Sequence, residues 1–212
     1  MRLDHLSYAA EHDGLRATAA RLGAAIGVEP VDGGLHPRFG TRNVVLPLAG
    51  GHYVEVVEVL EHPVADKAPF GRAVRARSLE GGGWLGWAVA VEDLAPVEAR
   101  LGREAVPGNR HRPDGVELRW RQIGVNGLIA DPQLPFFTRW ETGPELHPSV
   151  DADGTVKLAG LRIAGSPDRL CQWLGEPRDH PLDEVDVEWV APHGTPGILA
   201  VTFASPTGVV EV

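Results

Sequence analysis

His5 and Glu55 are side chains with acid–base chemistry that interrupt two runs typical of β-strands, residues 3–9 and 52–60. Both runs alternate along the chain, so each candidate shares a strand face with apolar neighbours. A carboxylate is rarely buried without a partner, and an imidazole binds metal ions and shuttles protons. Two interpretations stay open: a hydrogen-bonded pair that holds two strands together, or a pair that serves as metal ligands or as general acid and base.

A turn-rich loop at residues 36–43 adds two polar candidates, His36 and Asn43. A proline and a glycine restrict and shape its backbone. We expect His36 and Asn43 to orient substrate oxygens, and the alternative for His36 is that it only braces its own loop. His147 is a further candidate, with a surface turn as the alternative because a proline follows it.

Aromatic and basic residues follow between positions 84 and 140. Aromatic side chains on strands usually form core, but an apolar wall with a few polar groups is also typical of a small-molecule site. We expect Trp87 and Phe137 to contact the substrate and Arg139 to bind a substrate carboxylate, with a surface position as the alternative for Arg139. The basic run 110–112 could bind an anion, although such runs usually lie in solvated loops. The full set of candidate wall residues is Trp84, Trp87, Phe136, Phe137 and Trp140.

The same order of expected elements, a strand, a helix and three strands, recurs along the chain. Residues 1–62 form the first βαβββ module, 63–83 a linker with a short helix, 84–141 the second module and 142–212 a third, similar module. Residues 128–130 count as strand material in the second module. A single module buries one sheet face only, so we expect an α+β fold in which two modules pair. The third must then dock on that pair or on another chain.

Composition narrows the class of protein. The chain has 212 residues, 43% hydrophobic and 23% charged, as in soluble globular proteins. No run is long and apolar enough for a membrane span, and no signal peptide is visible. The single cysteine, Cys171, excludes an internal disulfide and fits a cytoplasmic protein. A net charge of −9 argues against nucleic acid as a partner, and no glycine motif indicates a nucleotide cofactor.

The repeated module, with a histidine on its first strand and a glutamate on its fourth, resembles the vicinal oxygen chelate superfamily of glyoxalases, extradiol dioxygenases and bleomycin-resistance proteins. More narrowly, the chain resembles the glyoxalase-like domain family. This resemblance implies paired modules that form a cupped, incomplete barrel around the active site. It rests on five runs: Asp4-His5-Leu6, Gly33 to Asn43, Gly51 to Val57, Leu134 to Trp140 and His147-Pro148-Ser149.

The resemblance also implies that His5 and Glu55 are ligands of one divalent metal, Zn, Ni, Mn or Fe. In the family the second module supplies the remaining ligands from equivalent strands. Here Trp87 stands opposite His5 in the alignment of the two modules, and the strand that matches Glu55 has no carboxylate. A third ligand would have to come from His36 or His147.

We therefore expect a cytoplasmic, glyoxalase-like enzyme of the lyase, isomerase or dioxygenase type, acting on a small carbonyl- or oxygen-bearing molecule. Glu55 would be base or metal ligand, and His5 ligand or acid. The alternative is a non-catalytic protein that sequesters a small molecule, as resistance members of the superfamily do. We expect a homodimer whose partner is a small molecule, without nucleic acid or membrane.

Overall fold

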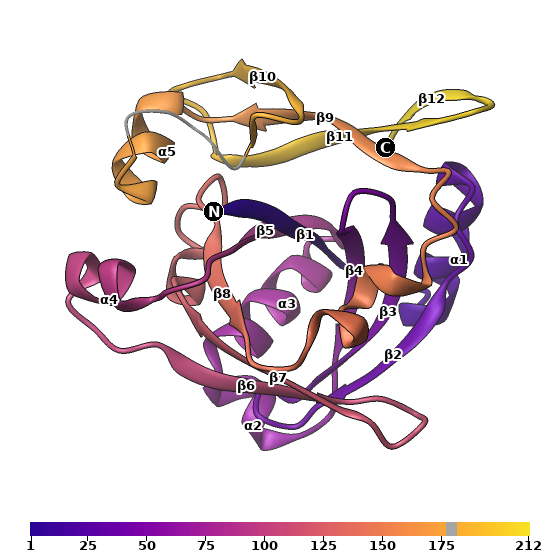
Figure 1. Cartoon of the computed structure of the whole chain (residues 1–212), viewed down its shortest axis with the longest axis horizontal. Coiled ribbons are helices and arrows are strands. Elements are labelled where there is room, and N and C mark those ends of the chain that lie inside the picture. Colours follow the sequence, from indigo (N-terminus) through magenta and orange to yellow (C-terminus); the bar gives the residue numbers. More distant parts are fainter. Residues whose placement is uncertain (177–181) are drawn as a thin grey trace.

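The computed structural model describes residues 1–176 and 182–212 and contains a ring of eight strands (Figure 1). The first half of the ring comes from consecutive elements near the N-terminus. Gly27, at a left-handed φ of 79°, ends the helix of this half by donating its N–H to the Gly23 carbonyl. The elements are β1 (Arg2–Ala9), α1 (Leu15–Ile26), β2 (Val31–His36), β3 (Thr41–Leu48) and β4 (His52–Val59).

The second half of the ring repeats this order after two connecting helices. Its elements are α2 (Pro63–Lys67), α3 (Pro69–Leu79), β5 (Gly83–Ala90), α4 (Ala95–Leu101), β6 (Val106–His111), β7 (Glu117–Ile123) and β8 (Phe136–Trp140). The strand expected at residues 128–130 is wrong. This stretch follows the 3₁₀ turn η1 (Val125–Gly127), and the amides of Ala130 and Asp131 bond back to Gly127. The prolines that follow lack the N–H a strand ladder needs.

The eight strands close in the order β1-β4-β3-β2-β6-β7-β8-β5. The paired-module fold is confirmed, but the ring is closed where an incomplete barrel was expected. The two seams between the halves differ in length. β1 and β5 pair along most of their length, whereas β2 and β6 join at the single register pair Leu35–His111.

Two hydrophobic clusters lie on opposite sides of the ring. Inside it, α3 contributes Phe70 and Val74, which pack against strand residues such as Val57 and Phe136. In Figure 1 this helix appears within the ring of strands. The outer cluster joins strand residues such as Leu6 to α1 and to the C-terminal sheet. The strands are therefore apolar on both faces, so a polar inward side chain marks a special position.

The C-terminal part forms a second sheet that crosses above the ring in Figure 1. Its strand order, β10-β9-β11-β12, differs from that of the first two modules, although the order of elements along the chain is similar. Trp84 of β5 stacks on Phe203 with ring centroids 6.4 Å apart, and its indole N–H donates to the Val212 carbonyl at 3.0 Å. The elements are η2 (Pro144–Leu146), η3 (Pro148–Asp151), β9 (Lys157–Ala164), α5 (Pro167–Leu174), β10 (Asp186–Val190), β11 (Gly197–Ser205) and β12 (Gly208–Glu211).

This sheet answers the question of where the third module docks, because it covers the outer side of the barrel in the same chain. The expected homodimer stays a prediction. The helices are short: α1 has 12 residues, against about 20 for a bilayer crossing. In the part of the chain that the structure describes, no helix is long and apolar enough to span a membrane.

Candidate active site

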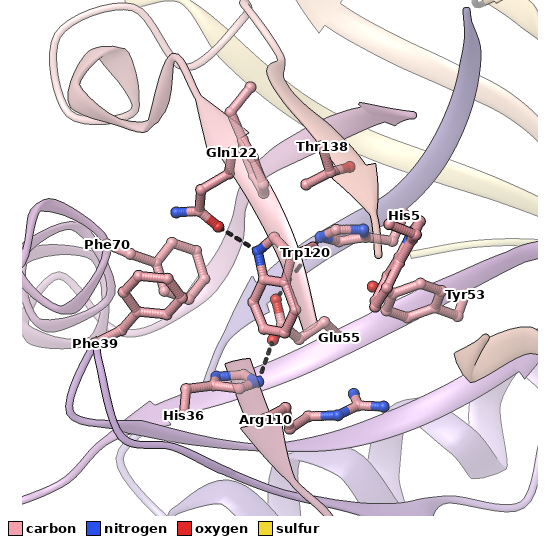
Figure 2. A pocket seen from close by; sticks show the side chains of 12 residues that line it. His5, His36, Phe39, Tyr53, Glu55, Phe70, Arg110, Trp120, Gln122 and Thr138 are labelled. Atoms are coloured by element: carbon pink, nitrogen blue, oxygen red, sulfur yellow. Dashed lines mark hydrogen bonds and ion pairs between the residues drawn. The ribbon is translucent and has the colours of Figure 1, made fainter. Parts of the chain in front are cut away.

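A largely enclosed cavity lies inside the ring, where side chains from both halves of the barrel meet (Figure 2). A water-sized molecule can occupy about 30 Å³ of it. Five of the twelve lining residues are Phe or Trp and the other seven are polar or charged, so apolar surface and convergent polar groups are combined, as in small-molecule sites. The aromatic side chains are Phe39, Phe70, Trp120, Phe136 and Trp140. The polar and charged ones are His5, His36, Tyr53, Glu55, Arg110, Gln122 and Thr138.

The Glu55 carboxylate is held in this cavity by the strands on both sides of β4. The parallel register of β1 and β4 places Ser7 beside Glu55, and Ser7 Oγ donates to Oε2 at 3.2 Å. Asn43 on β3 donates its Nδ2–H to Oε1 at 3.0 Å. Both carboxylate oxygens are thus oriented by neutral donors and keep further lone pairs. Asn43 therefore positions Glu55 and is not among the residues that line the cavity.

His36 faces the same carboxylate from β2. Its Nδ1 lies 2.9 Å from Thr41 Oγ1, and its Nε2 lies 3.6 Å from Glu55 Oε1. Burial lowers the pKa of His36 to about 4, with the nearby Glu55 charge opposing that shift. His36 is therefore a neutral imidazole at pH 7. When the Thr41 hydroxyl donates to Nδ1, the ring hydrogen is on Nε2 and points toward Glu55.

His5 reaches the cavity next to an irregularity in β1. Leu3 pairs with Val89 of β5 and His5 pairs with the adjacent Ala88, so Asp4 is an extra residue on β1. Such a bulge changes the direction of the side chains around it. Strict alternation along residues 3–9 would place Asp4 on the opposite face from His5, and this bulge interrupts that alternation.

Asp4 holds the His5 ring from behind. The Asp4 Oδ2 lies 3.0 Å from His5 Nδ1, and the imidazole stacks on the Tyr53 ring with centroids 4.6 Å apart. The remaining ring nitrogen, Nε2, faces the cavity 3.9 Å from Glu55 Oε2. Because the carboxylate accepts at Nδ1, the hydrogen of a neutral His5 ring lies on Nδ1 and the Nε2 lone pair points into the site.

Asp4 is a candidate site residue that sequence reasoning missed, and it is fully buried. Its carboxylate also lies 3.2 Å from His147 Nε2, accepts from Trp140 Nε1 at 3.2 Å and pairs with Arg2 at 3.1 Å. Burial alone would raise the pKa of Asp4, but the hydrogen bonds with His147 and His5 outweigh it and hold that pKa well below its usual range. Asp4 is therefore a buried carboxylate ion that joins two imidazoles.

Arg110 enters the cavity from β6 and is only 5% exposed. Along this strand Arg110 is buried while Asn109 and His111 are more exposed, as strand alternation requires. The basic run that includes it predicts an anion site or, more commonly, a solvated loop, and the structure places Arg110 on a strand of the barrel. Burial lowers the pKa of Arg110, and Tyr53 and Glu55 oppose that shift by their charges. Burial also raises the pKa of Tyr53 well above its ordinary value.

Three expected contact residues lie elsewhere. Trp87 is buried in the outer cluster, where its indole N–H donates to the Gln133 carbonyl at 2.9 Å. Phe137 is in the same cluster, while its neighbours in sequence face the cavity. Arg139 is exposed and donates to the Glu92 carbonyl at 3.0 Å. The expected position of these three side chains in the site is therefore wrong, because each points away from the barrel interior.

The histidines do not complete the expected metal site. His5 and His36 approach different oxygens of Glu55, and His147 is separated from Glu55 by Asp4. Among the described residues, no group of three or more His, Cys, Asp or Glu side chains is arranged to hold a metal ion. The donor set in the described part of the chain therefore does not fit the divalent metal that the resemblance implies.

Comparison with known proteins supports the fold. A family model described as a glyoxalase-like domain matches residues 3–182. No curated protein matches the chain. A hypothetical protein from Staphylococcus aureus has 14% sequence identity and a TM-score of 0.59, with 99% of this chain and 84% of that chain covered.

Two methylmalonyl-CoA epimerase structures are also similar to part of the chain. The enzyme from Mycobacterium tuberculosis has 16% identity and a TM-score of 0.44, over 68% of this chain and 90% of that one. A Streptomyces coelicolor variant in complex with 2-nitronate-propionyl-CoA has 18% identity and a TM-score of 0.43, over 66% of this chain and 96% of that one.

Proposed function

Because this chain belongs to the glyoxalase-like domain family and has the vicinal oxygen chelate fold, we propose that its barrel cavity is the active site of an enzyme that moves a proton on a small carbonyl-bearing molecule. Glu55 is the base. The observation that carries this proposal is the arrangement around the Glu55 carboxylate. Two neutral donors fix its oxygens, and imidazole Nε2 atoms face them at 3.6 and 3.9 Å.

In this reaction Glu55 removes the proton from the carbon next to the carbonyl. The electron pair of the broken C–H bond forms the carbon–carbon double bond of an enolate, and the carbonyl electrons move to its oxygen. The proton is then on Glu55, which returns it to carbon in the second half of the reaction. Ser7 and Asn43 keep the carboxylate in place during both transfers.

His36 stabilises the enolate oxygen in this scheme. A neutral imidazole is a hydrogen-bond donor through Nε2 when its Nδ1 accepts from Thr41. The low pKa of His36 keeps the ring neutral, so Nε2 donates a hydrogen bond to the enolate oxygen and retains its own proton. Such a preorganised donor in a water-poor site contributes most where charge develops.

His5 supplies a second proton acceptor. Its Nε2 lone pair faces the cavity because Asp4 accepts at the other ring nitrogen. A substrate hydroxyl next to the carbonyl would transfer its proton to His5, so that a hydrogen could move between two oxygens while Glu55 acts at carbon. The buried Asp4 ion stabilises the imidazolium that results.

The test follows proton exchange at carbon. The purified protein is incubated in D₂O with a panel of 2-oxo acids, 2-hydroxy acids, their amides and simple aldehydes, and C–H signals are followed by proton NMR. We expect protein-dependent exchange for some members of the panel, and a loss of roughly 10²- to 10⁴-fold in Glu55→Gln.

Glu58→Gln is the matched control, because Glu58 lies on the same strand but pairs with Arg42 at 2.7 Å on the outer side. It should keep the exchange rate of the wild type. Equal rates in Glu55→Gln and the wild type would contradict the role of Glu55, and no exchange with any panel member would contradict an enzyme of this type.

The aromatic wall supports a second candidate, a non-catalytic binding protein. Five rings surround the cavity, and a pocket of this kind holds a ligand without needing a reaction. Saturable binding of a panel compound without exchange at any carbon would favour this candidate over the enzyme.

A further inference from the structure

Arg110 is a buried cation without a partner in the described part of the chain. The residue is 5% exposed, its side chain has no hydrogen bond or ion pair with another described residue, and its Nε is buried without an acceptor. A guanidinium stays protonated at any physiological pH, and an unpaired buried charge is strongly unfavourable. A folded protein tolerates such a group where a ligand supplies the missing hydrogen-bond acceptor and negative charge.

The surrounding charges leave room for an external anion. Glu55 lowers the cost of burying Arg110 at a distance, but the two side chains do not form an ion pair. The Glu55 oxygens are already held by Ser7 and Asn43. Figure 2 shows Arg110 next to His36 with its guanidinium in the space in front of Glu55 and Tyr53. The unused donors therefore face the same cavity as the proposed base.

We propose that Arg110 binds the carboxylate of the substrate, which makes the substrate class a small 2-oxo or 2-hydroxy monocarboxylic acid. This step rests on the proposed function for the position of the reacting carbon. A guanidinium and a carboxylate match as a fork with two parallel hydrogen bonds. A carboxylate bound there places the neighbouring 2-oxo or 2-hydroxy oxygen beside the His36 ring and the C–H bond next to the substrate carbonyl within reach of Glu55.

The charge balance of the cavity favours a monoanion over a phosphate. Among the described residues, Arg110 is the only arginine or lysine that lines it, while His36 is neutral and Glu55 adds a negative charge. A phosphate dianion would meet one cation and one carboxylate, which leaves uncompensated charge in a water-poor space. The cavity is small, with about 30 Å³ open to a water-sized molecule, so the ligand that enters it has to be compact.

The first experiment needs no variant. Binding of glyoxylate, pyruvate, 2-oxobutyrate, 4-methyl-2-oxopentanoate and the corresponding 2-hydroxy acids is measured by ligand-observed NMR, each beside its primary amide. We expect at least one acid to bind at least about tenfold more tightly than its amide, since a charged hydrogen bond is lost. Equal affinity for acid and amide, or no saturable binding of any acid, would overturn the proposal.

The second experiment uses two variants of Arg110. Arg110→Met removes the positive charge and preserves most of the side-chain volume. Arg110→Lys keeps the charge but loses the two parallel N–H donors of the guanidinium. We expect Arg110→Met to weaken the best acid at least about tenfold and leave its amide unchanged, with Arg110→Lys in between. Arg119→Met on the exposed side of β7 is the control. An acid that binds within twofold in Arg110→Met, checked for folding by circular dichroism, would overturn the assignment.

The two proposals fail in different ways. All binding measurements are repeated in Glu55→Gln, which retains Arg110 but lacks the base. Acid binding that depends on Arg110, without exchange in the wild type, would sustain the carboxylate site and remove the proton-transfer function. Exchange that is fast with amides and unaffected by Arg110→Met would sustain the proton-transfer function and remove the carboxylate site.

Discussion

Asp4 and His147 meet at 3.2 Å although 143 positions separate them in the chain. Asp4 belongs to the first strand, and His147 lies between two short 3₁₀ turns that follow the last strand of the ring. His147 also contacts Ser149 through its other ring nitrogen at 2.7 Å, so its orientation is fixed from both ends. The segment that leads to the C-terminal sheet therefore supports the side chain that orients His5.

This relationship predicts the effect of Asp4→Asn. The substitution removes a buried carboxylate ion that joins two imidazoles, so we expect a loss of about 3 kcal/mol in the free energy of unfolding at pH 7. Proton exchange should also fall, because Asn can present its N–H to His5 and select the wrong ring tautomer. Urea denaturation measures the first effect, and NMR exchange measures the second.

The pH dependence gives a sharper form of this prediction. The folded-state pKa of Asp4 is depressed, so its contribution is full above the ordinary pKa of 3.8 and is lost as the pH falls toward the folded value. Asp4→Asn should remove the decrease in the free energy of unfolding that protonation of Asp4 causes in acid. Asp114→Asn at an exposed ion pair is the control and should change stability by less than about 0.5 kcal/mol.

His36 predicts a pH effect in a different range. Its folded pKa of about 4 lies below the ordinary value of 6.5, so between these values the unfolded chain binds more protons. The His36 contribution to stability should be full above pH 6.5 and fall by about 3 kcal/mol on acidification to pH 4. His36→Gln should flatten this slope in urea denaturation, whereas the exposed His111→Gln should retain it. An unchanged slope in His36→Gln would show that another group is responsible.

Metal content is a third prediction. Because His5 and His36 approach different oxygens of Glu55, we expect protein purified without chelator to hold substoichiometric metal and its exchange activity to survive EDTA. Elemental analysis by mass spectrometry checks this directly. One Zn, Ni, Mn or Fe per chain that is lost in His5→Ala and Glu55→Ala, but kept in His111→Ala, would restore the expected metal site.

The sequence was sufficient to predict the repeated modules and to single out His5 and Glu55, whose side chains the structure brings together in one cavity. Alternating patterns around His5 and Glu55 identified both strands, because a polar side chain in an apolar row is conspicuous. The register was harder to predict, and a shift of one residue moves a side chain to the other face. This is why Phe137 was expected in the cavity wall together with Phe136, although only Phe136 lines it, and why the bulge hid Asp4.

Arg110 shows a different limit of prediction from a single sequence. Its neighbours in sequence are also polar, so the local pattern is typical of a solvated loop and carries no sign of burial. Only pairing with β7 and closure against β2 place this residue inside the barrel. Long-range contacts of this kind have no signature in a single sequence, and the same holds for the position of His147 behind Asp4.

The single register pair that joins β2 to β6 has a consequence for ligand binding. Leu35 and His111 form that pair, and the next residues along their strands toward the site are His36 and Arg110. The imidazole and the guanidinium thus belong to different modules and are connected laterally by one rung of the ladder. A molecule held between them acts as a cross-link at the narrowest junction of the ring, so that the strength of its binding and the resistance of the barrel to opening become linked properties.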